Sequence, residues 1–410
     1  MTLIVGAGIT GLAVGHFLGG QGPILERETV PGGLATQYPA QGRWFCYGGH
    51  YFHFQREAGV RPWVEGFSPF HRHRRVSRVF LWDRFVPFPI QFHLASFPAA
   101  ERRRVLGEML DRGPVTAGDL AGYLPQVFGR RLTELFFSPF QEKYYRLPLT
   151  SIAARMDRGS IPVPDRESVL AGAAGRRFPS AGYNSEFFFP AGGQRRFIER
   201  LAAPLRDRIR FGEEVREIDL ARRRVSTRRG EVPFDTLVTT MPLRDLVCRL
   251  RAPFPLPPAS ALRSISTLVV NAELTRRRRR FDWVYLPQAE IPFFRVGYYP
   301  GQLPPTVYLE MTPRPGEEWP AGRLEGAMAR TLETLGMIGR RSEIACWDAR
   351  RVPVSYVVFD ADWARVVPPL LAELKRHGVY SIGRYGSWNY TSMADDIASA
   401  RRTAEEIALR

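Results

Sequence analysis

The stretch LIVGAGITGLAVGHFLGGQGPILERE, residues 3–28, carries the pattern from which the fold is predicted. A short apolar run precedes Gly6, Gly8 and Gly11, which are spaced as G-x-G-x-x-G, and a second apolar run ends at Glu26. This order is typical of a strand, a tight turn and a helix whose N-terminus receives a pyrophosphate. An acid roughly 20 residues after the glycines holds the hydroxyls of an unphosphorylated ribose. We therefore predict a dinucleotide-binding domain that begins at the N-terminus.

Composition favours a globular protein that acts on small molecules. The 410 residues suit two or three domains, and 44% hydrophobic with 24% charged residues is ordinary globular usage. A net charge of +17 first suggests a nucleic acid as partner. The charge is almost all arginine, with Lys143 and Lys375 as the lysines, and only residues 276–280 form a run, which we interpret as a hairpin tip. We predict no nucleic-acid partner, but a basic field that attracts an anionic substrate.

Cysteine usage and hydropathy indicate the compartment. Cys46, Cys248 and Cys346 include no C-x-x-C pair, which argues against a disulfide scaffold and for a reducing environment. No basic segment precedes the first apolar run, and no apolar run reaches the length of a membrane span. We predict a cytoplasmic protein without a membrane span, and the sequence leaves its oligomeric state open.

The pattern along the chain predicts an α/β fold with insertions. Helical periodicity extends over 99–143, and strand-like segments dominate 268–360. We predict a discontinuous Rossmann-like cofactor domain, a mainly helical insertion that covers the substrate, and an antiparallel-sheet substrate domain. Their expected bounds are 1–70, 190–250 and 375–410 for the cofactor domain, 71–189 for the insertion, and 251–374 for the substrate domain.

A second glycine pair distinguishes between cofactors. The stretch LERETVPGGLATQ, residues 25–37, places Gly33 and Leu34 soon after Glu26 and Arg27. It resembles glutathione-reductase-type flavoproteins, particularly the amine oxidase and protoporphyrinogen oxidase branch. The resemblance implies FAD as the cofactor, with these residues close to its diphosphate and flavin.

The C-terminal segment is the second strong signal. An apolar strand ends at Gly383 and Arg384, and a loop leads to a helix from about Met393. Ser392 is placed to cap this helix, with Asp395 three residues later in a capping-box arrangement. A helix N-terminus directed at a flavin stabilises negative charge on the reduced ring. Arg384 is expected to reach the cofactor diphosphate.

Several segments, in this order, resemble the UDP-galactopyranose mutase-like branch of the same superfamily. They are YGGHYFH (47–53), RFVPFPIQFHL (84–94), FQEKYYRLP (140–148), GYNSEFFFPAGG (182–193) and GRYGSWNYTSM (383–393). The resemblance implies substrate contacts by Tyr145, Tyr183, Arg295 and Tyr390. It implies cofactor contacts by Gly6, Gly8, Gly11, Glu26, Arg27, Gly33, Leu34, Gly49, His50, Val215, Met241, Gly383, Arg384, Ser392 and Met393.

Two departures from the mutases bear on the activity. This chain has Ser160 where the mutases have an arginine, although Arg158 is nearby, and Val352 where they have a tyrosine. Half of the positions expected to bind the substrate diphosphate therefore carry different residues. Many amine oxidases hold a water near the flavin with a lysine, but neither Lys143 nor Lys375 matches that position. We therefore do not expect a straightforward amine oxidase.

The pair His50 and His53 raises the question of a metal site. In an extended segment, residues three apart point to opposite faces, so both are not expected to bind one ion. No cysteine or acid with suitable spacing completes a zinc set, and we predict no metal. The glycines before His50 instead suggest a chain that passes closely along the flavin. Either histidine is a candidate proton acceptor, with a pKa expected in the useful range.

These observations lead to three hypotheses. The first is an FAD-dependent oxidoreductase that transfers a hydride from a polar, sugar-like or phosphorylated substrate to flavin N5, with His50, His53 and Arg295 as catalytic residues. The alternative is a non-redox pyranose–furanose mutase, in which N5 of reduced FAD is the nucleophile. The third is a binding or assembly protein that retains the fold without turnover.

Overall fold

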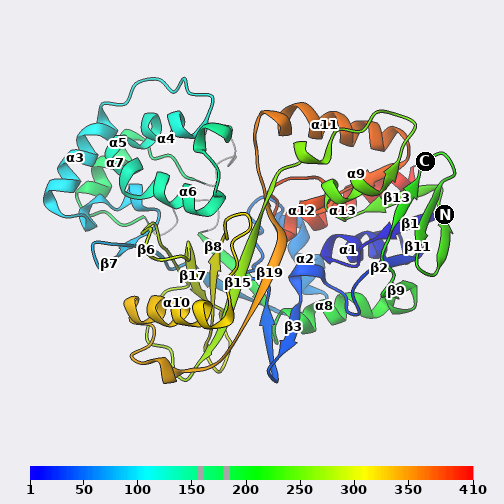
Figure 1. Cartoon of the computed structure of the whole chain (residues 1–410), viewed down its shortest axis with the longest axis horizontal. Helices are drawn as coiled ribbons and strands as arrows, with labels where there is room; N and C mark the ends of the chain where they lie inside the picture. The colour runs from blue at the N-terminus through cyan, green and yellow to red at the C-terminus, as the bar shows by residue number, and fades with distance from the viewer. Residues whose placement is uncertain (155–160, 179–184, 410) are drawn as a thin grey trace.

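Five parallel strands form the sheet that carries the glycine turn (Figure 1). They are β1 (Thr2–Val5), β2 (Ile24–Glu26), β9 (Ile209–Phe211), β13 (Thr236–Thr239) and β20 (Val379–Ser381), in the order β20-β13-β1-β2-β9. The apolar run before the glycines is the central strand and is almost wholly buried, as expected for a parallel strand covered on both faces. The computed structural model describes residues 1–154, 161–178 and 185–409. The mixed α/β class predicted from the sequence is confirmed.

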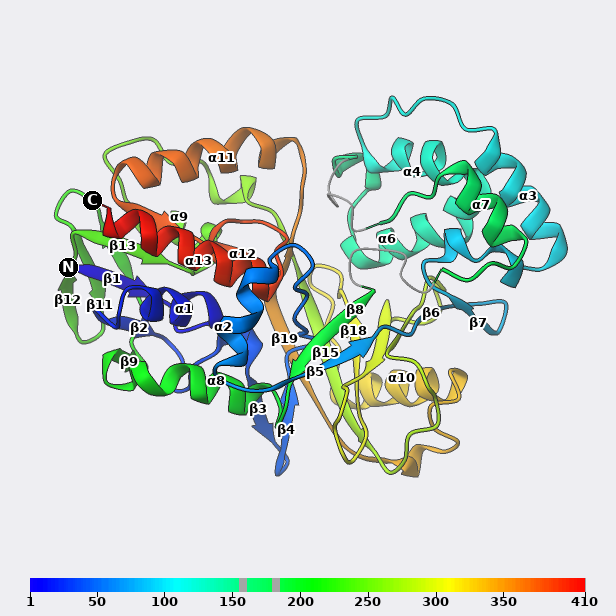
Figure 2. The same ribbon diagram turned by 180° about the vertical axis from the view of Figure 1, so that it is seen from behind.

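Helices cover this sheet, and a small second sheet extends it. The helices α1 (Ile9–Phe17) and α13 (Met393–Ala408) pack against each other and lie side by side in both ribbon views (Figures 1 and 2). Other helices of this part are α2 (Arg61–Glu65), α8 (Gln194–Ala202), α9 (Leu243–Arg249), α11 (Ala361–Arg376) and α12 (Gly383–Gly386). The small sheet consists of β10 (Glu217–Asp219), β11 (Arg224–Thr227), β12 (Gly230–Pro233) and β14 (Leu250–Arg251).

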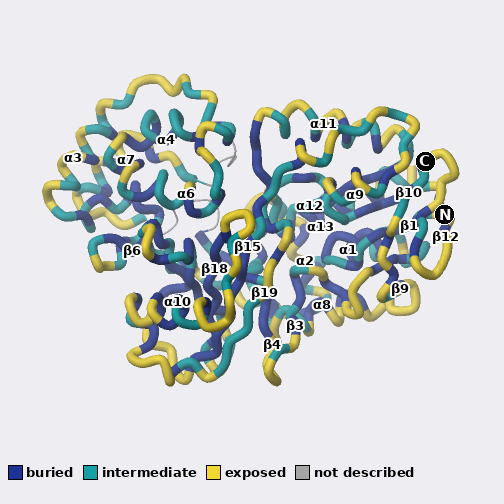
Figure 3. Tube along the Cα trace, in the orientation of Figure 1, coloured by how far each residue is buried: buried dark blue, intermediate teal, exposed yellow. Residues whose placement is uncertain are grey.

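A seven-stranded sheet forms the second large part. Its order is β19 (Ile344–Val357), β15 (Ser264–Leu274), β18 (Thr306–Met311), β17 (Arg295–Tyr298), β16 (Trp283–Tyr285), β6 (Ser77–Leu81) and β7 (Arg84–Pro87). All pairs are antiparallel except β16 with β6. The helix α10 (Ala321–Thr334) packs its apolar side into the same core. Figure 3 shows β15 and β18 as mostly buried, so this sheet is a covered wall within the molecule.

The helical unit lies beside this sheet (Figure 2). It contains α3 (Ala99–Leu110), α4 (Leu120–Phe128), α5 (Arg130–Leu132), α6 (Ser138–Tyr145) and α7 (Arg166–Ala173). Two short ribbons complete the fold. They pair β3 (Gln37–Ala40) with β4 (Arg43–Cys46), and β5 (Phe70–Arg74) with β8 (Glu186–Pro190).

The strand pairing differs from the predicted segment bounds in two places. Residues 77–87, which we placed in the helical insertion, form β6 and β7 and extend the seven-stranded sheet. Residues 361–376, which we placed in the substrate domain, form α11, which packs on β20 of the cofactor sheet. Both differences arise from contacts between segments far apart in the chain, which local patterns do not reveal. The domain bounds themselves remain a prediction.

The arginine run, residues 276–280, is an exposed connection and not a hairpin tip, which corrects our interpretation. It connects β15 to β16, and these two strands do not pair with each other. Arg278 donates two hydrogen bonds to Glu343, at 2.6 and 2.9 Å, and the side chain of Arg279 bonds the Leu335 carbonyl at 2.9 Å. The hydrogen bonds from Arg278 hold the pKa of the Glu343 carboxyl far below its usual range. The run therefore fastens the loop to the end of α10.

No helix within the described part of the chain combines the length and apolar character needed to cross a membrane.

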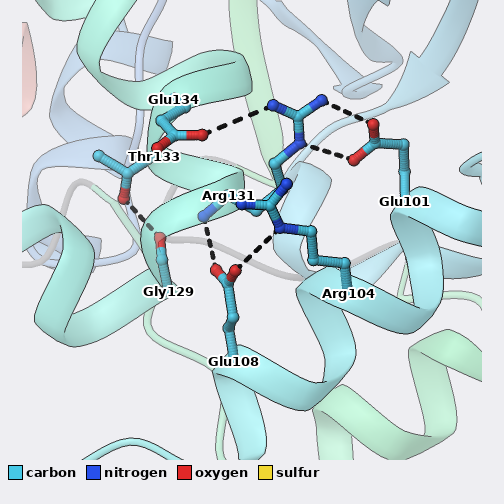
Figure 4. Close-up of polar contacts among 7 residues, drawn as sticks. All are labelled: Glu101, Arg104, Glu108, Gly129, Arg131, Thr133 and Glu134. Carbon is cyan, nitrogen blue, oxygen red and sulfur yellow. Dashed lines mark hydrogen bonds and ion pairs between the residues drawn. The ribbon is translucent and has the colours of Figure 1, made fainter.

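Arg131 connects three segments of the helical unit (Figure 4). Its guanidinium donates to both oxygens of Glu101 on α3, at 2.6 and 2.7 Å, and lies 3.5 Å from Glu134. Its backbone N–H donates to Glu108 at 2.5 Å. The hydrogen bond from Arg131 lowers the pKa of Glu101. A bidentate pair of this kind stabilises more than an ordinary surface ion pair.

We predict that Arg131→Met lowers the free energy of unfolding by about 1 kcal/mol at neutral pH. Because the folded-state pKa of Glu101 is depressed, the stabilisation is present above the ordinary glutamate pKa and disappears as the pH falls through the folded-state value. Urea unfolding at several pH values measures the difference. Arg103→Met, at an exposed position of α3, the helix that carries Glu101, is the control and should change little. An equal loss at all pH values would contradict the assignment to the ion pair.

Candidate active site

A single cavity of about 830 Å³ extends from the glycine turn to the helical unit. Its lining includes the cofactor and substrate residues predicted from the sequence, with two exceptions. Gly11 lies behind the turn, and Tyr183 is outside the described residues. The predicted residues on the cavity wall are Gly6, Gly8, Glu26, Arg27, Gly33, Leu34, Gly49, His50, His53, Tyr145, Val215, Met241, Arg295, Gly383, Arg384, Tyr390, Ser392 and Met393.

The glycine turn presents open backbone to the cavity. Gly8 is the N-cap of α1 and has no side-chain cap, and a Cβ added to it meets no atom within 4 Å. A Cβ on Gly11 would lie 1.9 Å from the carbonyl oxygen of Gly6, so Gly11 permits the helix to pack on the turn. Gly6 has φ of +100°, which favours glycine. The free N–H groups of the first turn of α1 are therefore available to bind an anion that approaches Gly8.

Glu26 lies at the end of β2, where the second strand leaves the turn. One carboxylate oxygen accepts the Ala7 N–H at 2.6 Å, and the other accepts the Glu28 N–H at 2.8 Å. Burial raises the pKa of this carboxyl, against the lowering effect of the two backbone bonds. The side chain is fixed on the cavity wall and keeps acceptor capacity for hydroxyl donors.

The N-terminus of α13 closes the opposite side of this region. Ser392 accepts the Asp395 N–H at 3.2 Å, and the Asp395 side chain accepts the Ser392 N–H at 2.8 Å. The capping box predicted from the sequence is confirmed. The next residue, Asp396, is buried and accepts a hydrogen bond from the Thr391 hydroxyl at 2.7 Å. Burial raises the pKa of Asp396 to about 6.

His50 and His53 both line the cavity, contrary to the alternation we expected. The chain around them is not a regular strand, because Gly48 turns it with φ of +123° and only Phe52 pairs, in an isolated bridge. The Nδ1 atom of His50 lies 3.2 Å from the Gly48 carbonyl, and that of His53 lies 3.2 Å from the Glu186 carbonyl. Burial lowers the pKa of each histidine to about 4, and for His50 nearby arginines add to the effect. The expectation of a pKa near neutrality is therefore wrong, and both imidazoles are neutral at pH 7.

Two arginines approach the cavity from different elements. Arg295 of β17 forms a bidentate ion pair with buried Glu310 of β18; its Nη2 lies 2.8 Å from Oε1 of Glu310 and 3.4 Å from the Tyr356 hydroxyl. Arg384 of α12 donates to the Thr391 carbonyl at 2.7 Å. Both arginines contribute to the lowered pKa of His50. Because Arg295 is paired with Glu310, Arg384 contributes the less compensated positive charge beside the neutral histidine.

Aromatic rings form the wall opposite the cofactor turn. Phe140 and Tyr144 of α6 stack with ring centres 6.0 Å apart, and Phe294 meets Tyr144 edge-on at 5.1 Å. Tyr144 also contacts Tyr356 at 4.9 Å. Tyr145, the predicted substrate residue, packs edge-on against Tyr144 at 4.6 Å. This wall is apolar apart from its hydroxyl groups and suits a ring-shaped ligand.

Comparison with known families assigns the chain. Residues 24–408 match the family model of flavin-containing amine oxidoreductases. The chain belongs to this family. Among solved structures, reduced UDP-galactopyranose mutase is similar with a TM-score of 0.90 and 20% identity, over 99% of this chain and 95% of that chain. A proposed protoporphyrinogen oxidase from Exiguobacterium sp. 255-15 gives 0.76 and 18%, over 100% and 98%. Putrescine oxidase with bound putrescine gives 0.67 and 17%, over 100% and 99%.

The cofactor is FAD, and the cavity fits it. The unobstructed backbone at Gly8 and the N-terminus of α1 are suited to hold the diphosphate. Glu26 is suited to hold the adenosine ribose, and its negative charge disfavours a 2′-phosphate. The predicted superfamily, with its protoporphyrinogen oxidase and mutase-like members, is confirmed. The roles of the individual residues remain predictions.

Sequence reasoning missed several residues of the cavity wall. Glu310 and Tyr356 were not singled out, and neither were Phe140, Tyr144 and Phe294. One signal was available for Glu310, because a single acid inside the apolar strand TVYLEM indicates a buried partner. The aromatic residues of α6 carry no comparable signal, since core and cavity rings have the same helical spacing.

We predict that Gly8→Ala leaves the fold intact but weakens FAD binding by about tenfold or more, because the methyl group occupies the approach to the diphosphate. The φ of –69° at Gly8 is accessible to alanine, so backbone strain is not the cause. Titration of FAD into apoprotein measures the affinity. Gly107→Ala is the matched control, because a Cβ there also meets no atom within 4 Å but lies on α3, outside the cavity lining. Equal affinities for the two variants would contradict this placement of the diphosphate.

We predict that buried His50 makes the protein acid-sensitive. Its folded-state pKa of about 4 is below its ordinary value of 6.5, so its contribution to stability is present above pH 6.5 and is lost as the pH falls towards 4. In urea unfolding, His50→Gln should reduce the pH slope of the unfolding free energy in this window by up to about 1.4 kcal/mol per pH unit. His71→Gln at an exposed position is the control. An unchanged slope in His50→Gln would show that the imidazole is not buried in its neutral form.

Proposed function

We propose that this protein is a flavin-dependent enzyme that acts on an anionic, sugar-like substrate and isomerises it without net oxidation. The observation that carries the proposal is the convergence of Arg295 and Arg384 beside His50 in the cavity that also contains the glycine turn. The likeness to reduced UDP-galactopyranose mutase supports it at the level of the fold. The glutathione-reductase-type arrangement of the cofactor domain is part of the same proposal.

The residues of the substrate side have defined tasks in this proposal. Bound FAD supplies a hydride acceptor when oxidised and a nucleophile when reduced. The arginines bind the anionic group of the substrate, and the Tyr356 and Tyr390 hydroxyls are available as donors to it. The rings of Phe140 and Tyr144 cover the substrate and exclude water from the cavity.

The protonation state of the histidines favours isomerisation over oxidation. Hydride removal from a hydroxyl-bearing carbon needs a group that accepts the hydroxyl proton, and such a group works best with a pKa near the operating pH. His50 and His53, with pKa values of about 4, are weak acceptors at pH 7. Isomerisation through a bound anion depends instead on the positive potential that the cavity has.

An FAD-dependent oxidoreductase is the second candidate, and one observation favours it. Val352 is buried and lines the cavity at the position where the mutases, by resemblance, have a tyrosine. Without the tyrosine hydroxyl, this position binds a diphosphate less tightly. It suits a substrate that is less polar at this point. Hydride transfer from such a substrate to FAD is the reaction that we predicted first from the sequence.

We predict that dithionite-reduced enzyme converts UDP-galactopyranose to its furanose isomer and that oxidised enzyme does not. Chromatographic separation of the sugar nucleotides measures the product. Equal product from oxidised enzyme would contradict the isomerase. Anaerobic bleaching of the flavin by the same substrate, without isomer, would favour the oxidoreductase. Purified protein that stays colourless after FAD is added would contradict both and favour a binding protein.

A further inference from the structure

Arg384 joins the cofactor turn through its backbone but not through its side chain. The preceding residue, Gly383, packs so closely on α1 that an added Cβ would lie 2.7 Å from the Thr10 hydroxyl oxygen. The guanidinium carbon of Arg384 lies elsewhere, 4.4 Å from the ring centre of Tyr390 and 5.2 Å from that of Tyr356. Tyr356 belongs to β19 of the seven-stranded sheet, on the substrate side.

Arg295 and Arg384, the two arginines that act on His50, differ in charge balance. Arg295 commits two nitrogen atoms to Glu310, and a bidentate carboxylate neutralises its charge. Arg384 donates to an uncharged carbonyl, and no ion pair joins it to a carboxylate within the described ranges 1–154, 161–178 and 185–409. Arg384 acts electrostatically on Asp396, but no ion pair joins the two, and the Asp396 side chain accepts from the Thr391 hydroxyl. Arg384 therefore has the less compensated charge.

Tyr356 connects the two arginines. Its hydroxyl lies 3.4 Å from Nη2 of Arg295, and Arg384 lies against its ring. A planar aromatic ring beneath a guanidinium fixes the plane of the guanidinium without using its N–H donors. The neutral ring of His50 experiences both charges, which places it beside the same site.

We propose that Arg384 binds the anionic group of the substrate rather than the diphosphate of FAD, and that Arg295, held by Glu310, positions Tyr356 beside that group. This inference rests on the proposed function in that the substrate is anionic. It differs from two expectations of the sequence analysis, in which Arg384 reaches the cofactor diphosphate and Arg295 binds the substrate. Tyr356 and Tyr390 stack on each other with ring centres 6.0 Å apart, and the guanidinium of Arg384 lies against this pair, so its N–H donors are available to a phosphate or carboxylate.

The test measures cofactor content and anion affinity separately in the holoenzyme. UDP is the probe, with inorganic pyrophosphate as a second anion without a ring, and calorimetric titration gives the dissociation constants. Arg384→Gln should retain FAD at wild-type stoichiometry and bind UDP at least about tenfold more weakly. Arg384→Lys, which keeps the charge but loses the planar fork, should fall between them. Arg330→Gln, at an exposed arginine of α10 outside the cavity lining, is the matched control and should bind UDP like the wild type.

The alternative outcomes are distinct. Loss of FAD from Arg384→Gln, with normal UDP affinity in the molecules that retain it, would place the arginine at the cofactor and overturn the inference. Retained FAD with unchanged UDP affinity would also overturn it, while leaving the proposed function intact. Failure of the wild type to bind either anion would overturn the anionic substrate and the inference together. If Arg384→Gln does not fold, Arg384→Lys decides, because unchanged affinity in that variant contradicts a planar two-point contact.

Discussion

The close approach of three distant chain segments at the β1–α1 turn is the constraint on which the rest of the structure depends. Gly6 lies so near Thr240 that an added Cβ would come within 2.2 Å of its hydroxyl oxygen, and Gly383 is similarly close to Thr10. At these two positions a threonine side chain lies directly against the glycine, which leaves no room for a larger residue, and the ends of β1, β13 and β20 come together there. The carboxyl ends of parallel strands at such a point form the crevice where open α/β sheets bind ligands. The remaining segments are placed relative to this crevice.

The seven-stranded sheet contributes a rigid wall with charged side chains, which the cofactor sheet does not provide. Arg295 and Glu310 pair directly across neighbouring strands, in register. Breaking such a pair would leave an uncompensated charge in a low-dielectric environment, which is far more costly than the pair itself. The strands therefore hold the guanidinium at a fixed depth, and the Tyr356 hydroxyl beside it is fixed in turn. The helical unit adds an apolar cover, whose rings lie against this wall without changing its charge.

The sequence predicted those features that depend on local geometry and missed those that depend on long-range pairing. The glycine spacing and the Ser392 capping box follow from backbone sterics and unsatisfied N–H groups, so a single short segment is enough to recognise each. The parallel pairing of β6 with β16 joins residues about two hundred positions apart, and nothing in either strand specifies that neighbour. The protonation of His50 was mispredicted for the same reason, because burial and two arginines from distant segments determine its pKa. The partner of Arg295 could have been predicted from the sequence, since a lone acid in an apolar strand has few ways to be stable.

The distribution of charge in the cavity links the fold to the chemistry that it permits. The His50 imidazole stays neutral because burial disfavours its charged form and because Arg384, and more weakly Arg295, repel an added positive charge. Binding of an anion there offsets the arginine charges and raises the affinity of His50 for a proton. In the function that we propose, an anionic substrate would therefore shift the protonation behaviour of His50. The arginine that we propose as the anion contact would then also control the acid–base character of the histidine beside it.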